Sequence, residues 1–187
     1  MKTNSVENSV HLRPAETGDA DAIAALHAES WRVAYRGMFR DEFLGGDVLT
    51  DRKAVWRERF ANPKSNQRVI VAEDRNGICG FVCAYGNEDA EYGTFIDNLH
   101  VRIDLKRKGI GRRLMAEVAR WSIEKYPRAG MYLEVLELNT PARHFYERLG
   151  ANNIKSWLWE PPGGGEVVAL RYAWPTPESL LTPMASD

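Results

Sequence analysis

Cysteine is scarce in this 187-residue sequence: only Cys79 and Cys83 occur, close together in one apolar segment. Two cysteines so placed exclude the disulfide framework that staples small secreted domains. No apolar run approaches the roughly 18 residues that a membrane-spanning helix needs. The first ten residues also lack the apolar core of a secretory signal. We therefore expect a cytoplasmic protein with no membrane partner.

An excess of charge of either sign is also missing, since 25 basic residues face 26 acidic ones. Without a global positive field the chain is a poor ligand for nucleic acid, so no nucleic-acid partner is expected. The four histidines are scattered without ligand spacing, and no metal site is predicted. Hydrophobic residues make up 44% and charged residues 27%, as in an ordinary globular domain.

Hydrophobic spacing and turn signals predict one domain over residues 10–174. A flexible N-terminus (1–9) precedes it and a proline-containing tail (175–187) follows it, and both are expected to be loosely attached. Strands are predicted at 10–13, 69–72, 78–85, 94–101, 132–135, 154–159 and 167–174. Helices are predicted at 19–34, 50–60, 109–125 and 140–149. This order favours an α/β (α+β) fold in which helices pack on the faces of a central mixed sheet.

The most informative segment is a basic turn at the start of a predicted helix, residues 102–113, with six basic residues and one acidic residue. Cations are unfavourable at the positive end of a helix dipole, whereas a bound polyanion reverses the sign of that effect. Gly109 and Gly111 would let a phosphate approach the backbone N–H groups. The segment is no Walker-type loop and lacks the third glycine of a dinucleotide fingerprint. A diphosphate cradle and a solvated basic turn both remain open.

A second segment, residues 133–151, has the pattern of a strand, a capped turn and a short helix. Together the two segments resemble the GNAT superfamily of acyl-CoA-dependent N-acyltransferases. The family's Gln/Arg-x-x-Gly-x-Gly/Ala signature matches Lys106-x-x-Gly109-x-Gly111, with Lys in the first position. The family's strand-turn-helix signature is matched in register by Leu133, Val135, Asn139, Ala142 and Tyr146.

The resemblance implies a mixed, mostly antiparallel sheet of about seven strands flanked by about four helices. It implies direct acetyl transfer from acetyl-CoA to a primary amine, which can be a small amine, an amino acid or a peptide N-terminus. It also implies that no metal takes part and that a homodimer can form. The residues implied to bind coenzyme A are Leu99, His100, Val101, Lys106, Arg107, Lys108, Gly109, Ile110, Gly111, Arg112, Asn139, Ala142 and Tyr146.

Acetyl transfer to an amine needs a base to deprotonate the amine and benefits from an acid at the leaving thiolate. By the family pattern Tyr146 is that acid. Glu134 is one candidate base, because it precedes Tyr146 by the same interval as in relatives that acetylate ribosomal-protein N-termini. Asp97 is the other, as a carboxylate on an otherwise apolar strand face. It alternates there with Phe95, Leu99 and Val101. Each carboxylate can equally be an ordinary ion-pair partner, and the sequence does not rank them.

The acceptor of GNAT enzymes is selected by the first two helices and the last hairpin. Trp31 and Tyr35, on a helical stripe with His27, are therefore candidate acceptor-binding residues, although such a stripe can also be core. Two other functions stay open. One is a non-catalytic acyl-CoA-binding regulatory domain, and the other is a nucleic-acid-binding module that uses residues 102–113.

Overall fold

A seven-stranded sheet organises the chain, as the sequence predicted. The computed structural model describes residues 9–161 and 164–182. The strands are β1 (His11–Pro14), β2 (Gln67–Asp74), β3 (Gly77–Asp89), β4 (Gly93–Val101), β5 (Met131–Leu136), β6 (Asn152–Trp159) and β7 (Val167–Trp174). Their spatial order is β1-β2-β3-β4-β5-β7-β6. Neighbours are antiparallel except β4 and β5, which run parallel at the centre of the sheet.

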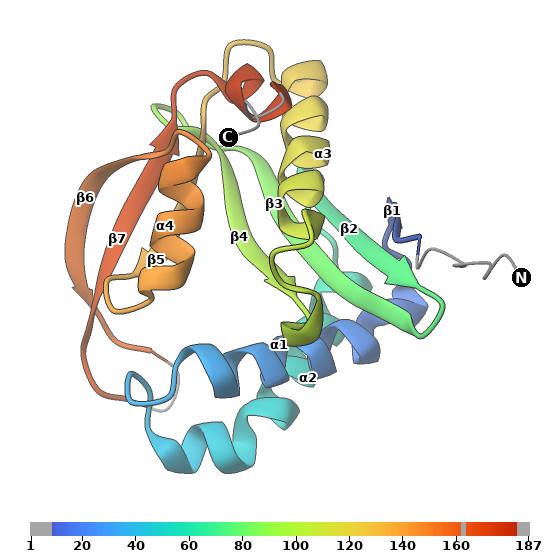
Figure 1. The fold of residues 1–187 in the computed structure, drawn as a ribbon, viewed down its shortest axis with the longest axis vertical. Helices are drawn as coiled ribbons and strands as arrows, with labels where there is room; N and C mark the ends of the chain where they lie inside the picture. The colour runs from blue at the N-terminus through green and yellow to red at the C-terminus, as the bar shows by residue number, and fades with distance from the viewer. Residues whose placement is uncertain (1–8, 162–163, 183–187) are drawn as a thin grey trace, which may run out of the picture.

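The four predicted helices are confirmed, each with its ends shifted by two residues or fewer. They are α1 (Ala20–Ala34), α2 (Val48–Ala61), α3 (Ile110–Lys125) and α4 (Thr140–Arg148). Shorter helical turns are η1 (Thr17–Asp19), η2 (Phe43–Asp47, π-helical), η3 (Ile103–Leu105) and η4 (Pro177–Leu181). Figure 1 shows α1 and α2 crossing below the sheet, with α3 and α4 beside its two halves. Within the described ranges, no helix has the length and apolar character needed to cross a membrane.

The sheet separates two regions of apolar packing. On the face of α3 and α4, a stripe of helix residues such as Leu114 and Val118 packs against β3, β4, β5 and β7. On the other face, Ile23 of α1 and Trp56 of α2 pack against Phe81 of β3. Each of these side chains is inaccessible to solvent, and full burial of one stabilises the fold by about 1.5–3 kcal/mol. The central strands are therefore held rigidly from both faces.

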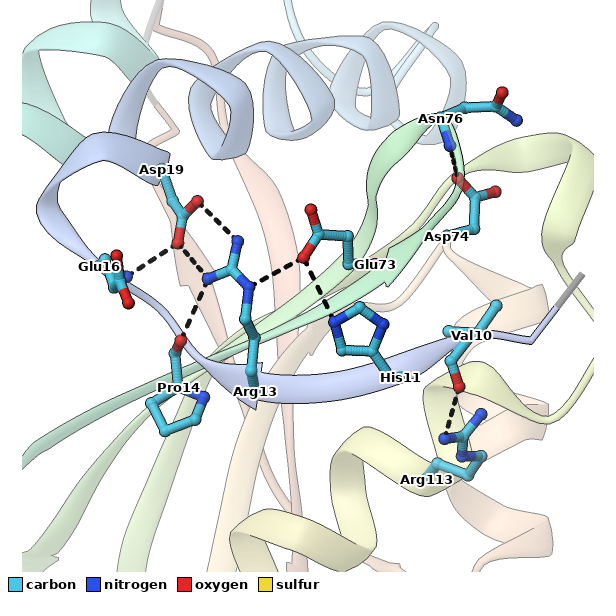
Figure 2. Close-up of polar contacts among 10 residues, drawn as sticks. All are labelled: Val10, His11, Arg13, Pro14, Glu16, Asp19, Glu73, Asp74, Asn76 and Arg113. Carbon is cyan, nitrogen blue, oxygen red and sulfur yellow. Dashed lines mark hydrogen bonds and ion pairs between the residues drawn. The ribbon is translucent and has the colours of Figure 1, made fainter.

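A charged network attaches β1 to its surroundings, as Figure 2 shows. The Arg13 Nε donates to Glu73 of β2 at 2.9 Å, and its Nη atoms donate to the Asp19 carboxylate at 2.7 and 3.0 Å. These hydrogen bonds from Arg13 lower the pKa of Asp19. Arg113 of α3 donates to the carbonyl oxygen of Val10 at 2.8 Å. The predicted flexible N-terminus lies outside the described residues, apart from residue 9.

The prediction of a loosely attached C-terminal tail is wrong for residues 175–182. These residues include η4, whose Leu180 is only 3% exposed and belongs to the core beside α3. The Arg112 guanidinium donates to the carbonyl oxygen of Thr182 and holds the end of this segment. Two adjacent leucines, Leu180 and Leu181, in a proline-rich stretch form no repeating apolar pattern that would reveal such docking. Of the turn predicted between β6 and β7, Pro162 and Gly163 lie outside the described residues.

Candidate active site

The parallel strands β4 and β5 separate part-way along the sheet. They pair only over Thr94–Ile96 and Met131–Leu133, so the rest of each strand borders a gap. The Arg102 N–H donates to the Cys79 carbonyl oxygen of β3 at 2.8 Å. Because backbone directions alternate in an antiparallel ladder, residues 99 and 101 direct their N–H and C=O groups toward the gap. The end of β4 thus offers an unpaired edge to an extended ligand.

A β-bulge in β4 lies where the gap opens. Ala84 pairs with Ile96 and Cys83 with Asn98, so Asp97 is an extra residue without an opposite partner. The bulge reverses the alternation of side chains. Phe95 packs on the α1 and α2 side, whereas Leu99 and Val101 pack on the α3 side. The predicted common face for residues 95, 97, 99 and 101 is therefore wrong.

The basic turn forms a cradle of free backbone donors at the start of α3. Gly109 is the N-cap with φ +79°, Arg107 has φ +61°, and no side chain caps the helix. Within the described part of the chain, the N–H groups of residues 107–112 find no acceptor. A Cβ atom at Gly109 would meet nothing within 4 Å, so the cradle faces open space. Free N–H groups, a positive helix end and open space are the features that a diphosphate requires.

Tyr146 lies on α4 and packs against the same apolar cluster as Leu99 and Val101 of the free β4 edge. Asn139 is the N-cap of this helix, and its Oδ1 accepts the Ala142 N–H at 3.4 Å. The half-buried Tyr146 ring packs edge-on against Phe145 and Trp174, with centroids at 5.3 and 6.2 Å. Burial raises the pKa of Tyr146 above its usual range, and the nearby Tyr35 phenol raises it further. Its hydroxyl is therefore a proton donor at neutral pH.

Of the two predicted acceptor-binding residues, Trp31 is part of the apolar core and Tyr35 is half-buried. Trp31 is 7% exposed and packs with Ala28, Phe39 and Leu44. Tyr35, at the end of α1, is half-buried, with its ring centroid 4.7 Å from that of Phe39. Burial raises the pKa of Tyr35 to about 12, while the Arg52 charge lowers it and the Asp97 charge raises it. Arg52, Asp97 and Tyr146 are therefore near enough to Tyr35 for their ionisation and its own to be coupled.

Comparison with known proteins agrees with this arrangement. Residues 25–151 match the model of the acetyltransferase (GNAT) family. The chain belongs to the GNAT family. An uncharacterized N-acetyltransferase, YuaI of Bacillus subtilis (strain 168), is 24% identical over 92% of this chain and 97% of its own length. A probable N-acetyltransferase of Mycobacterium tuberculosis, Rv2775, is 28% identical over 88% of this chain and 93% of its own length.

Solved structures share the fold. The PaiA N-acetyltransferase of Thermoplasma acidophilum, in complex with coenzyme A, superposes with a TM-score of 0.66 at 17% identity. The match covers 86% of this chain and 98% of that one. This GNAT protein is an acetyl-CoA-dependent N-acetyltransferase. The free N–H groups at the start of α3 suit the diphosphate of acetyl-CoA, and the unpaired edge of β4 suits its extended arm.

Both carboxylates predicted as candidate bases of this GNAT enzyme are ion-paired. Asp97 Oδ2 lies 2.6 Å from Arg59 Nη1, but the contact is not aligned as a hydrogen bond and the oxygen is buried. Glu134 is exposed, and its Oε1 accepts from Arg171 Nη2 at 2.8 Å. The Arg171 guanidinium also lies 4.6 Å from the centroid of the Tyr132 ring. Asp97 Oδ2 therefore keeps unused hydrogen-bonding capacity in a buried position, whereas Glu134 is exposed at the surface.

His100 turns away from the gap that Leu99 and Val101 border. Its ring centroid lies 4.5 Å from that of His27 of α1, and the Trp56 indole N–H donates to His27 Nδ1 at 3.0 Å. Burial lowers the pKa of His27 well below its usual range and that of His100 to about 3. Both histidines are thus neutral packing partners beneath the site.

Three arginines near these residues were not predicted from the sequence: Arg52, Arg59 and Arg171. Arg52, Trp56 and Arg59 recur at helical spacing, and this spacing could have placed both arginines on one face of α2. That face packs toward the sheet, since Trp56 is fully buried. No comparable pattern marks Arg171, because a single basic residue on a strand is usually solvent-exposed.

Proposed function

We propose that this GNAT enzyme transfers the acetyl group directly to a primary amine, which is a small amine, an amino acid or a peptide N-terminus. The observation that carries the proposal is the grouping around the gap between β4 and β5. A protonated phenol (Tyr146) borders it from one side, and a buried carboxylate (Asp97) borders it from the other. An acid for the leaving group and a base for the nucleophile are the two groups that direct transfer needs.

The donor acetyl-CoA supplies an activated acetyl thioester when bound. In our proposal its diphosphate is held by the backbone N–H groups of residues 107–112, with Lys106, Arg107 and Lys108 adding positive charge. The edge of β4 at Leu99 and Val101 bonds the extended arm, and a free N–H there polarises the thioester carbonyl. The Asn139 amide can donate to the same arm, because its cap uses only its oxygen.

Proton transfers are assigned to residues on opposite borders of the gap. Asp97 accepts the proton of the acceptor ammonium, directly or through a water, so that the amine lone pair becomes available. Tyr146 then gives its proton to the departing thiolate. Tyr35, whose pKa responds to the Asp97 charge, is assigned to positioning the acceptor. Glu134, held by Arg171, is the second candidate base, and it serves an acceptor that approaches from the rim.

Two relatives support an amine acceptor without defining it. The L-ornithine N5-acetyltransferase NATA1 of Arabidopsis thaliana is 33% identical over 54% of this chain and 42% of its own length. The histone acetyltransferase MCC1 of the same plant is 24% identical over 75% of this chain. Their acceptors are a free amino acid and a protein. A homodimer through the edge strand β6, whose Leu158 is 65% exposed, is a further part of the proposal.

The test combines titration of acetyl-CoA with an assay of thiol release over a panel of amines, amino acids and peptides. The proposal expects binding together with thiol release that depends on the amine. Binding without release on any member would instead favour the non-catalytic regulatory domain.

A further inference from the structure

A buried arginine with one free end lies on the acceptor side of the sheet. Arg52 of α2 is 8% exposed, and its guanidinium carbon lies 4.2 Å from the centroid of the Trp31 ring. Asp51 Oδ2 accepts from Arg52 Nε at 2.8 Å and also from Nη2. Nη1 forms no hydrogen bond with any described residue, yet it is not sealed from solvent. One edge of the guanidinium is thus occupied and the other end remains a donor.

Ring contacts connect this arginine to the candidate active site. The Trp31 ring lies 5.5 Å from that of Tyr35 and 4.9 Å from that of His27, between centroids. His27 in turn contacts His100, on the part of β4 that borders the gap. The Arg52 charge also lowers the pKa of Tyr35 and of His100, which agrees with this proximity. Arg52 and Tyr35 therefore pack against the same Trp31 ring, on the α1 and α2 side of the sheet.

The charges of the cleft favour a ligand that carries both signs. Arg59 is balanced by Asp97 and Arg52 by Asp51, so these four side chains sum to zero. A simple alkylammonium would add an uncompensated positive charge among these half-buried side chains, and an unpaired charge there is costly. A ligand with an ammonium toward Asp97 and a carboxylate toward Arg52 would keep the net charge of the group at zero. Arginine is also the side chain whose geometry best matches a carboxylate.

We propose that Arg52 Nη1 is a carboxylate-binding subsite for the acceptor, so that the amine acetylated by this enzyme is a free amino acid. This inference rests on the proposed transfer to a primary amine and specifies its substrate class. Asp51 orients the guanidinium through its other edge, and Trp31 supports its face. The subsite binds the acceptor and takes no part in bond making.

Matched acceptor pairs test the subsite. Free amino acids and their carboxamides differ in the negative charge and in the basicity of the amine. The basicity difference is the same for every enzyme variant, so the change in the ratio of their kcat/KM values between wild type and variant isolates the carboxylate. We expect the wild-type ratio to exceed 10-fold, and Arg52→Gln to reduce it toward one through a higher KM for the free acid. Arg57→Gln is the matched control: Arg57 lies on the same helix, exposed and paired with Asp21, and its loss should leave the ratio unchanged.

A second variant guards against a folding defect in Arg52→Gln. Asp51→Asn removes the competing carboxylate while Arg52 stays in place, and we expect it to increase the ratio. Transfer to both members of every pair with equal kcat/KM in the wild type would overturn the subsite alone. Equal losses on both members in Arg52→Gln, with no change in Asp51→Asn, would do the same. Bound acetyl-CoA with no transfer to any member would overturn the proposed function, and the subsite with it.

Discussion

The carboxylate of Asp97 lies 2.6 Å from the guanidinium of Arg59, at the residue where β4 leaves its register with β3. Asp97 lies on the α2 side, as does Phe95 two residues earlier, so this part of β4 follows regular alternation. The bulge then moves Leu99 and Val101 to the α3 side. One inserted residue thus separates the candidate base from the strand residues that face α3.

The two candidate bases can be separated by neutralising each one. We expect Asp97→Asn to lower kcat/KM by about 10²-fold or more and to remove the acidic limb of its pH profile. Glu134→Gln should change kcat/KM less than 10-fold, since Glu134 is exposed and held by Arg171. Profiles of kcat/KM against pH for both variants decide the question. Loss of the acidic limb in Glu134→Gln alone would transfer the role to Glu134.

Removal of the Tyr146 hydroxyl tests the acid. Tyr146→Phe keeps the ring that packs against Phe145 and Trp174, so the fold and acetyl-CoA binding should persist. We expect kcat to fall by about 10²-fold, because the thiolate must leave without a proton donor. Titration with acetyl-CoA and steady-state kinetics measure the two effects. An unchanged kcat would reject Tyr146 as the acid.

A methyl group at the cradle tests the anion site. Gly109→Ala places a Cβ at φ +79°, where the backbone strain is about 1–2 kcal/mol. The methyl group also enters the open space that the diphosphate needs. We expect the Kd for coenzyme A to rise 10-fold or more. Gly37→Ala is the matched control, because Gly37 has φ +76° and equal open space but lies in the α1–α2 connection. Equal Kd values for the two variants would contradict a cradle at residues 107–112.

Acid should destabilise the fold through His27. Burial lowers the pKa of His27 in the folded state, while the unfolded side chain titrates near 6.5. The contribution of neutral His27 to the free energy of unfolding is therefore fully present above about pH 6.5, and it is lost as the pH falls below that value. At pH 5 the loss should be on the order of 1–2 kcal/mol. Urea unfolding at pH 8 and at pH 5 measures this change in the free energy of unfolding. His144 is exposed, and His144→Gln is the control that should show the same change as the wild type. His27→Gln should reduce this pH-dependent loss, and the remainder should come from His100, whose pKa burial lowers to about 3. An unchanged loss in His27→Gln would contradict the assignment.

The order of strands and helices could be predicted because each element carries its own periodicity and turn signals. The basic turn with Gly109, and the Asn139-capped helix with Tyr146, are likewise local patterns of the chain. Their juxtaposition across the β4–β5 gap came from the family resemblance, since residues so distant in sequence carry no local sign of meeting. What remained hidden depends on tertiary contacts: Arg59 beside Asp97, Arg171 beside Glu134, and Leu180 against α3.

The common face of Asp97 with Leu99 and Val101 was predicted wrongly for a physical reason. Strict alternation holds only in a regular strand, and a bulge leaves no composition signal when its residues are ordinary strand formers. The roles of Asp97, Glu134 and Tyr146 remain predictions, and the variants above test each one.

The most direct test of the account is thiol release from acetyl-CoA in the presence of single amines, with the mass of each product measured. We expect thiol release only with primary amines, each of which yields a product heavier by one acetyl group, and the fastest release with free amino acids. Tight binding of acetyl-CoA with no amine-dependent release, or release with no acetylated amine, would contradict it.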